Sequence, residues 1–310
     1  MTPDELLAAL GPAGLRVQRN GHVVLTGPLY RLAAGVDTAL TELSGLWDAA
    51  PEEHPAMLDA AVLQSTGYLT SFPQLATFPV CLDPDTRNLE HFADGDPLDR
   101  GAVRLTATAP VSQVLTPAAC YHLYPHHRGE ALDEVLHLTT RNTCFRRETA
   151  YEPLRRQWSF RMREIVCLGG RSEVTDFLAD ARETVSALLR ALDLPADWAV
   201  ATDPFFRPAR SAKYLAQRVQ PVKHEALFEG DLALASVNLH EDCFGAAFDI
   251  TRNGGPATTG CVAFGIERWL HALVRRHGPR PSDWPDPANT ARGLAASLGA
   301  TPAVRRAVPS

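Results

Sequence analysis

The sequence lacks three features that would each point to a class of protein. Its 310 residues hold only six cysteines, none in a C-x-x-C pair, which argues against a disulfide scaffold or a compact zinc knuckle. Its 30 basic residues are outnumbered by 36 acidic ones, so it lacks the positive footprint of a nucleic-acid-binding protein. No run approaches the roughly 18 apolar residues that span a bilayer, and the first residues, MTPDELLAAL, are acidic where a signal peptide is basic. We therefore expect a soluble, cytoplasmic protein with no membrane or nucleic-acid partner.

The composition that is present suits a folded α+β protein, with 45% apolar residues to build a core. Apolar spacing and capping residues predict helices over residues 3–10, 30–50, 172–192 and 266–277. Asn20-Gly21 between two apolar stretches predicts a hairpin. Short apolar runs predict the strands of an antiparallel sheet, at residues 144–148, 159–168, 198–202, 224–228, 232–239 and 245–250.

No segment is a clear linker, so we expect one continuous unit. It divides into an N-terminal α/β extension, residues 1–65, and a main domain, residues 66–310. The proline-rich stretch after Gly278 predicts an extended tail.

Two segments carry arginines in patterns that suit a nucleotide. The first runs from Phe145 to Glu164 as F-R-x-E, a charged loop, and R-x-x-x-F-x-x-x-E. A hairpin of this kind can place guanidinium groups on phosphates and an aromatic ring on adenine. The second, Gly260–Arg268, predicts a strand that passes through glycine into a helix.

These segments resemble motifs 2 and 3 of the class II aminoacyl-tRNA synthetases, which implies an antiparallel sheet flanked by helices. The stretches LTPAACYHLYPHHRGE, ATDPFFRPARSAKYLAQRVQPVKHE and ASVNLHEDCFGAAFDI resemble the amino acid:[carrier protein] ligases. These ligases are truncated homologues of the archaeal type of seryl-tRNA synthetase. The resemblance covers residues 70–277. It implies that an amino acid, with glycine or alanine favoured, is activated by ATP and Mg²⁺ as an adenylate. It also implies transfer to the phosphopantetheine thiol of an acyl-carrier-like protein, and a homodimer.

The resemblance also assigns roles to residues of the two motifs and of the strands between them. Arg146 and Arg268 are the expected catalytic residues, because adenylate formation depends on positioning and on neutralisation of phosphate charge. The expected ATP-binding residues are Arg146, Glu148, Arg156, Phe160, Glu225 and Arg268. The expected substrate-binding residues are Glu148, Lys223, Ser236 and Asn238. Leu232 and Leu234 stand where a synthetase carries a magnesium-binding glutamate, which leaves the magnesium ligand unassigned.

The family resemblance further implies a zinc ion held by Cys120, Glu164 and Cys261. Such a donor set leaves one tetrahedral position open, where the amino group of the substrate can bind. We expect the remaining cysteines, Cys81, Cys144, Cys167 and Cys243, to lie in the core. Because the attacking carboxylate is already ionised, no general base is required. We therefore expect His126, His127 and His137 to be structural or exposed.

One local basic segment interrupts this acidic chain. Residues 206–223 contain no acidic side chain, and the resemblance implies that this segment docks the acidic carrier protein. The expected docking residues are Arg207, Arg210, Lys213 and Arg218. A solvated helix face would have the same composition.

Two other functions remain open on the sequence alone. One is a free-standing enzyme that charges or edits tRNA. The other is a non-catalytic relative of the synthetases that binds nucleotide or regulates a partner, although the intact motif arginines argue against it.

Overall fold

A seven-stranded sheet forms the centre of the computed structural model, which describes residues 2–210, 215 and 221–299. The strand order is β11-β12-β13-β16-β10-β9-β3. Its bounds are β3 (Ala50–Glu52), β9 (Leu136–Phe145), β10 (Ser159–Gly169), β11 (Ala196–Val200), β12 (Lys223–Phe228), β13 (Leu232–Glu241) and β16 (Thr258–Gly265). Neighbouring strands are antiparallel except for β3 and β9, which are parallel. The expected α+β fold, an antiparallel sheet flanked by helices, is confirmed apart from the parallel pair of β3 and β9.

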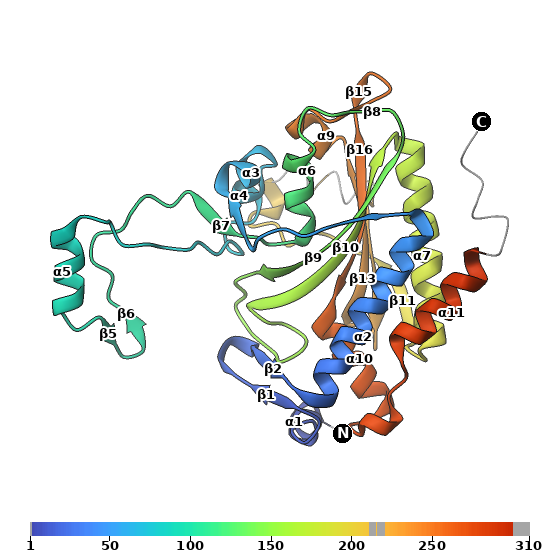
Figure 1. The fold of residues 1–310 in the computed structure, drawn as a ribbon, viewed down its shortest axis with the longest axis horizontal. Coiled ribbons are helices and arrows are strands. Elements are labelled where there is room, and N and C mark those ends of the chain that lie inside the picture. The colour runs from blue at the N-terminus through green and yellow to red at the C-terminus, as the bar shows by residue number, and fades with distance from the viewer. Residues whose placement is uncertain (1, 211–214, 216–220, 300–310) are drawn as a thin grey trace.

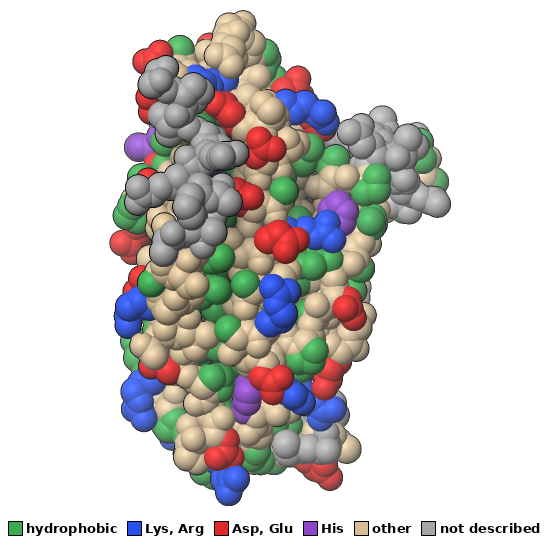
Figure 2. All heavy atoms as spheres, turned by 90° about the vertical axis from the view of Figure 1, so that its right-hand side faces the viewer, with side chains coloured by type: hydrophobic (Ala, Val, Ile, Leu, Met, Phe, Trp, Pro, Cys, Tyr) green, Lys and Arg blue, Asp and Glu red, His purple; other side chains and the backbone are tan. Residues whose placement is uncertain are grey.

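Helices cover one face of this sheet (Figure 1): α2 (Gly27–Ser44), α7 (Arg171–Ala191), α10 (Ile266–His277) and α11 (Pro287–Gly299). They and the inward side chains of the strands form the largest apolar core, in which Trp269 of α10 is fully buried. Its indole nitrogen donates to the carbonyl oxygen of Leu234 at 2.7 Å. Over the outer surface of this layer, charged side chains of both signs are scattered rather than gathered by sign (Figure 2).

The other face carries shorter elements and a second apolar cluster. These elements are α3 (Ala60–Ser65), α4 (Tyr68–Ser71), η3 (Ala119–His122), α6 (Leu123–His126) and α9 (Cys243–Phe248). Side-chain alternation along the strands separates the faces. On β10, Ile165 and Cys167 belong to the helix-side core, whereas Val166 and Leu168 belong to the opposite cluster.

An arm leaves the body between α4 and β7 (Gln113–Leu115), on the left of Figure 1. It contains α5 (Thr86–Asp94), β5 (Leu98–Asp99) and β6 (Ala102–Val103). The chain begins with α1 (Pro3–Ala9), β1 (Leu15–Val17), η1 (Arg19–Gly21) and β2 (Val23–Leu25). The remaining short elements are η2 (Gly45–Trp47), β4 (Met57–Asp59), β8 (Ala131–Leu132), η4 (Pro208–Arg210), β14 (Thr251–Arg252), β15 (Gly255–Pro256) and η5 (Pro281–Asp283).

Three local predictions are wrong. Residues 245–250 are not a strand, because Cys243–Phe248 is helix α9; so short an apolar run does not distinguish helix from strand. The tail is not wholly extended, because Asp286 caps α11 by accepting from the backbone of Asn289, with Pro287 in the first turn. Cys81 is exposed rather than in the core.

Of the strand predicted at residues 144–148, only Cys144 and Phe145 lie in a strand, at the end of β9, because the chain leaves the sheet there for the loop before β10. The other predicted elements are present with small shifts. The hairpin around Asn20-Gly21 pairs β1 with β2, and Asn20 adopts a positive φ of 59° as such a turn requires. The helix predicted to end at residue 50 ends at Ser44. Cys144 and Cys167 are buried, and Cys243 is half-buried. Among the described helices, none has both the length and the apolar character needed to cross a membrane.

Candidate active site

A cleft of about 570 Å³ is lined by Cys120, Phe244 and Cys261 of the second apolar cluster, so it opens on the sheet face opposite the four long helices. Every residue predicted to bind ATP, substrate or zinc lines it. These residues are Cys120, Arg146, Glu148, Arg156, Phe160, Glu164, Lys223, Glu225, Ser236, Asn238, Cys261 and Arg268. Residues from distant parts of the sequence therefore share one cavity.

Strand register explains this convergence. Glu225 of β12 lies opposite Ser236 of β13. Ser236 in turn lies opposite Ala263 of β16, and Ala263 lies opposite Glu164 of β10. Two residues along the same strands, Lys223 lies opposite Asn238, and Asn238 lies opposite Cys261. Because alternate residues of a strand share a face, these two rows point to the same side of the sheet.

The arginines of the two motifs meet at one end of the cleft. Arg146 follows β9, and its guanidinium lies 5.3 Å from the centre of the Phe160 ring. Its Nε donates to the carbonyl oxygen of Pro117 at 2.7 Å. Arg268, in the first turn of α10, donates to the carbonyl oxygens of Arg155 and Ala233 at 3.0 and 3.3 Å. Backbone carbonyls thus hold both guanidinium groups in place.

The positive charges of Arg146, Arg156 and Arg268 lie close enough to repel one another. Burial, followed by the positive charge of Arg146 and then of Arg156, lowers the pKa of Arg268. Glu148 offsets part of this repulsion, because its carboxylate pairs with Arg156 at 3.2 Å. Two half-buried arginines, Arg146 and Arg268, with the exposed Arg156 beside them form a suitable site for a polyanion.

A second polar group lies across β12 and β13. The Lys223 ammonium lies 2.9 Å from a carboxylate oxygen of Asp203 and 3.3 Å from one of Glu225. Ser236 donates its hydroxyl to the side-chain oxygen of Asn238 at 3.0 Å. These contacts fix the directions of the side chains expected to bind substrate.

The predicted metal ligands form a compact cluster at the floor of the cleft. The Sγ atoms of Cys120 and Cys261 and a carboxylate oxygen of Glu164 all lie within 4.8 Å of one another, and all three side chains are buried. The backbone nitrogen of Cys120 donates to Oε1 of Glu164 at 3.1 Å. Burial, followed by the charge of Cys261, raises the pKa of Glu164 to about 8. The pKa of Cys261 is lowered, first by a hydrogen bond from Cys120. Two thiol groups and a carboxylate that converge in a buried site match the donors of a zinc ion.

Sequence reasoning did not assign two polar residues of this cleft. His240 lies with its Nε2 3.6 Å from Sγ of Cys261, and its Nδ1 lies 3.1 Å from the hydroxyl oxygen of Thr259. Asp203 is the partner of Lys223. The two-residue spacing of Ser236, Asn238 and His240 on β13 could have revealed His240. No local pattern marks Asp203.

The predicted docking segment is only partly described. Phe205, just before it, and Lys223, at its end, line the cleft, so the segment begins and ends beside the cavity. Arg207 is exposed, with its guanidinium 5.1 Å from the centre of the Phe206 ring. Arg210 ends η4. Lys213 and Arg218 lie outside the described residues.

Comparison with known proteins gives named relatives, although no family model matches the chain. The chain is 37% identical over 248 residues to amino acid–[acyl-carrier-protein] ligase 1 of Bradyrhizobium diazoefficiens, spanning 77% of this chain and 75% of that protein. It is 35% identical to ligase 2 of the same organism over 253 residues, 78% of this chain and 74% of the relative. Over 192 residues it is 27% identical to the type-2 serine–tRNA ligase of Methanopyrus kandleri, 56% of this chain and 36% of that protein.

Solved structures share the fold at low sequence identity. M. kandleri SerRS, in complex with A. aeolicus tRNASec, superposes with a TM-score of 0.78 at 20% identity. The match covers 99% of this chain but 63% of that one, so this chain spans less than two thirds of the synthetase. Seryl-tRNA synthetase from Pyrococcus horikoshii, complexed with ATP, gives a TM-score of 0.62 at 14% identity over 89% of this chain and 58% of that one.

Proposed function

This chain belongs to the amino acid–[acyl-carrier-protein] ligase family, and from that premise we propose that it activates a small amino acid with ATP and transfers it to a carrier protein. The observation that carries the proposal is one cleft that holds the arginines of both motifs beside the cluster of Cys120, Glu164 and Cys261. The amino acid is glycine or alanine, and the acceptor is the phosphopantetheine thiol.

In the first step, the carboxylate of the amino acid attacks the α-phosphorus of ATP. A phosphorus–oxygen bond forms, the bond to the bridging oxygen breaks, and pyrophosphate leaves. Arg146, Arg156 and Arg268 neutralise the phosphates, with the Mg²⁺ that accompanies ATP, and Phe160 stacks on adenine. Glu148 and Glu225 complete the nucleotide site. Arg146 and Arg268 are the catalytic residues, because they are held by backbone carbonyls before the reaction begins.

The amino acid occupies the other end of the cleft. Lys223, Ser236 and Asn238 bind the substrate there, and Glu148 contacts both the nucleotide and the amino acid. Cys120, Glu164 and Cys261 would hold zinc, whose chemistry as a Lewis acid is to accept the lone pair of an uncharged amino group. The aromatic rings of Tyr121 and Phe244, which line the cleft with centres 5.7 Å apart, limit the room for a side chain. This crowding favours glycine or alanine.

In the second step, the thiol of the carrier attacks the acyl carbon, a thioester forms and AMP leaves. The carrier docks through Arg207, Arg210, Lys213 and Arg218, because positive charge beside the cleft attracts an acidic protein. The position of Phe205 and Lys223 in the wall of the cleft supports entry of the phosphopantetheine arm there. We expect the enzyme to be a homodimer that acts on no tRNA.

Amino-acid-dependent exchange of pyrophosphate into ATP tests the first step with a panel of amino acids. Labelled amino acid is then offered to holo carrier proteins, to the same carriers without phosphopantetheine, and to total tRNA. We expect exchange with glycine or alanine and label on holo carriers alone. Exchange followed by tRNA charging would identify a tRNA ligase. Absence of exchange with every amino acid would identify a non-catalytic nucleotide-binding protein.

A further inference from the structure

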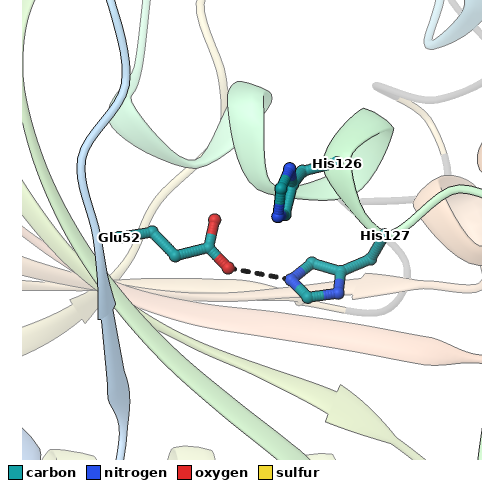
Figure 3. A group of neighbouring side chains, drawn as sticks. All are labelled: Glu52, His126 and His127. Atoms are coloured by element: carbon teal, nitrogen blue, oxygen red, sulfur yellow. Dashed lines mark hydrogen bonds and ion pairs between the residues drawn. The ribbon is translucent and has the colours of Figure 1, made fainter.

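A second group of metal-binding side chains lies outside the cleft, where the end of β3 meets the end of α6. Glu52 is the last residue of β3, His126 is the last of α6, and His127 follows it. One ligand atom from each lies within 4.8 Å of the others. Figure 3 shows the carboxylate of Glu52 and both imidazole rings gathered in the space between strand and helix.

The contacts of His127 place a positive charge in this group. Its Nε2 lies 2.9 Å from Oε1 of Glu52, and its Nδ1 lies 2.9 Å from Oε2 of Glu130. A neutral imidazole carries a single N–H and can donate to only one of these carboxylates. A divalent ion bound by Nε2 and Glu52 would leave the Nδ1–H of His127 to donate to Glu130. The ring of His126 supplies a third donor at the same place, which favours a metal ion.

The surroundings hold this group in position. Nε2 of His54 lies 2.8 Å from Oε2 of Glu52, and the side-chain amide of Asn142 donates to the carbonyl oxygens of His54 and Pro55. The ring of His122 stacks on that of His54, with centres 5.3 Å apart. His122 is 7% exposed, and its Nε2 has no hydrogen-bond partner among the described residues. The stacked ring of His122 helps to fix His54, which in turn contacts the carboxylate of Glu52.

We propose that Glu52, His126 and His127 bind a divalent transition-metal ion, separate from the ion proposed for the cysteines. Imidazole and carboxylate donors suit zinc, nickel or cobalt. Glu130 orients His127 by accepting from its Nδ1–H, which leaves the Nε2 lone pair for the metal. Since the backbone hydrogen bonds of short helices alone stabilise them weakly, the ion strengthens the attachment of α6 to the sheet edge. The same segment contains η3, which carries Cys120.

Cobalt binding to the metal-free protein tests this site. Cobalt held by cysteine has an intense thiolate-to-metal absorption band, whereas cobalt held by nitrogen and oxygen has only weak visible bands. In the Cys261→Ser variant we expect one strongly bound cobalt per chain without the thiolate band. If that variant folds poorly, the parent protein should bind a second cobalt that adds no thiolate absorption.

Substitutions in the Cys261→Ser background identify the ligands. His126→Ala removes an exposed side chain and should weaken cobalt binding at least about tenfold, as should Glu52→Gln. Glu130→Gln should weaken it by about 10- to 100-fold, as for loss of a carboxylate that orients a histidine ligand. His91→Ala, an exposed histidine of α5, is the control and should leave binding unchanged.

The thermal midpoint gives a second measurement. Cobalt should raise it in the parent and in His91→Ala, and should raise it less in His126→Ala. The proposal is overturned if the protein binds no cobalt outside the cysteine site, because a proton then completes the His127 contacts. It is equally overturned if His126→Ala binds cobalt as tightly as His91→Ala.

Discussion

The two faces of the central sheet carry different chemistry, although the same strands form both. On β16, Val262 and Phe264 lie in the helix-side core, whereas Cys261 and Ala263 line the cleft. The helix side holds apolar side chains that stabilise the fold, and the cleft side holds the charged side chains that we propose bind the nucleotide and the amino acid. Substitutions on alternate residues of one strand should therefore separate stability from activity.

The largest expected effect is on the cleft side. Cys261→Ser should lose the metal ion of the cysteine site, though not an ion at Glu52, His126 and His127, and should abolish pyrophosphate exchange, because a serine hydroxyl is a poor zinc ligand. Metal content by mass spectrometry and the exchange rate measure the two losses. Cys81→Ser, at an exposed cysteine, is the matched control. Full metal content and full exchange in Cys261→Ser would remove the metal from the mechanism.

On the helix side, Trp269→Ala should lower the free energy of unfolding by about 3–5 kcal/mol, because it leaves a cavity in the core. Denaturant titration measures the change. Trp198→Ala, at a half-buried tryptophan of the edge strand β11, should cost less. If both variants lost the same free energy of unfolding, the main apolar core would not lie between α10 and the sheet.

Arg146→Ala should reduce exchange by about 2–4 kcal/mol of transition-state stabilisation, with a much smaller change in stability. Steady-state exchange kinetics give the first value and denaturant titration the second. The neighbouring Arg147 is exposed and lies outside the cleft lining, so Arg147→Ala is the control. If Arg147→Ala lost as much activity as Arg146→Ala, the assignment of Arg146 alone to the nucleotide site would be contradicted.

The smallest effect is expected for the basic segment, residues 206–223. Combined Arg210→Glu and Lys213→Glu should slow carrier loading about tenfold and spare exchange, because local charge steers the encounter. The control is Arg190→Glu, which reverses a charge on the outer surface of α7, away from the cleft. If the double variant slows both steps equally, this segment has no separate docking role.

The cleft side was largely predictable from the sequence, because its residues belong to motifs with fixed spacing and strand alternation orders them. Glu164 and Cys261 lie on adjacent antiparallel strands, and only their register, set by the whole sheet, brings them together. Elements that depend on tertiary packing were missed. Helix α9 is too short for its apolar pattern to reveal it, and the start signal Asp286-Pro287 of α11 lies within a proline-rich stretch.

Contacts between segments that lie far apart in the sequence were not predictable. Glu52 and His127 are 75 residues apart and belong to no shared motif. Their meeting follows from the parallel pairing of β3 with β9, which the sequence did not indicate. The same holds for Asp203, which pairs with Lys223, 20 residues further along the chain.

A double-mutant cycle on Arg146 and Arg268 tests most directly whether both motifs act on one triphosphate. The exchange rates of Arg146→Ala, Arg268→Ala and the double variant are compared with that of the parent. If the two guanidinium groups share one nucleotide, the double variant should lose less activity than the sum of the single losses, by about 0.5–3 kcal/mol. Strictly additive losses, or normal exchange in either single variant, would contradict a common site.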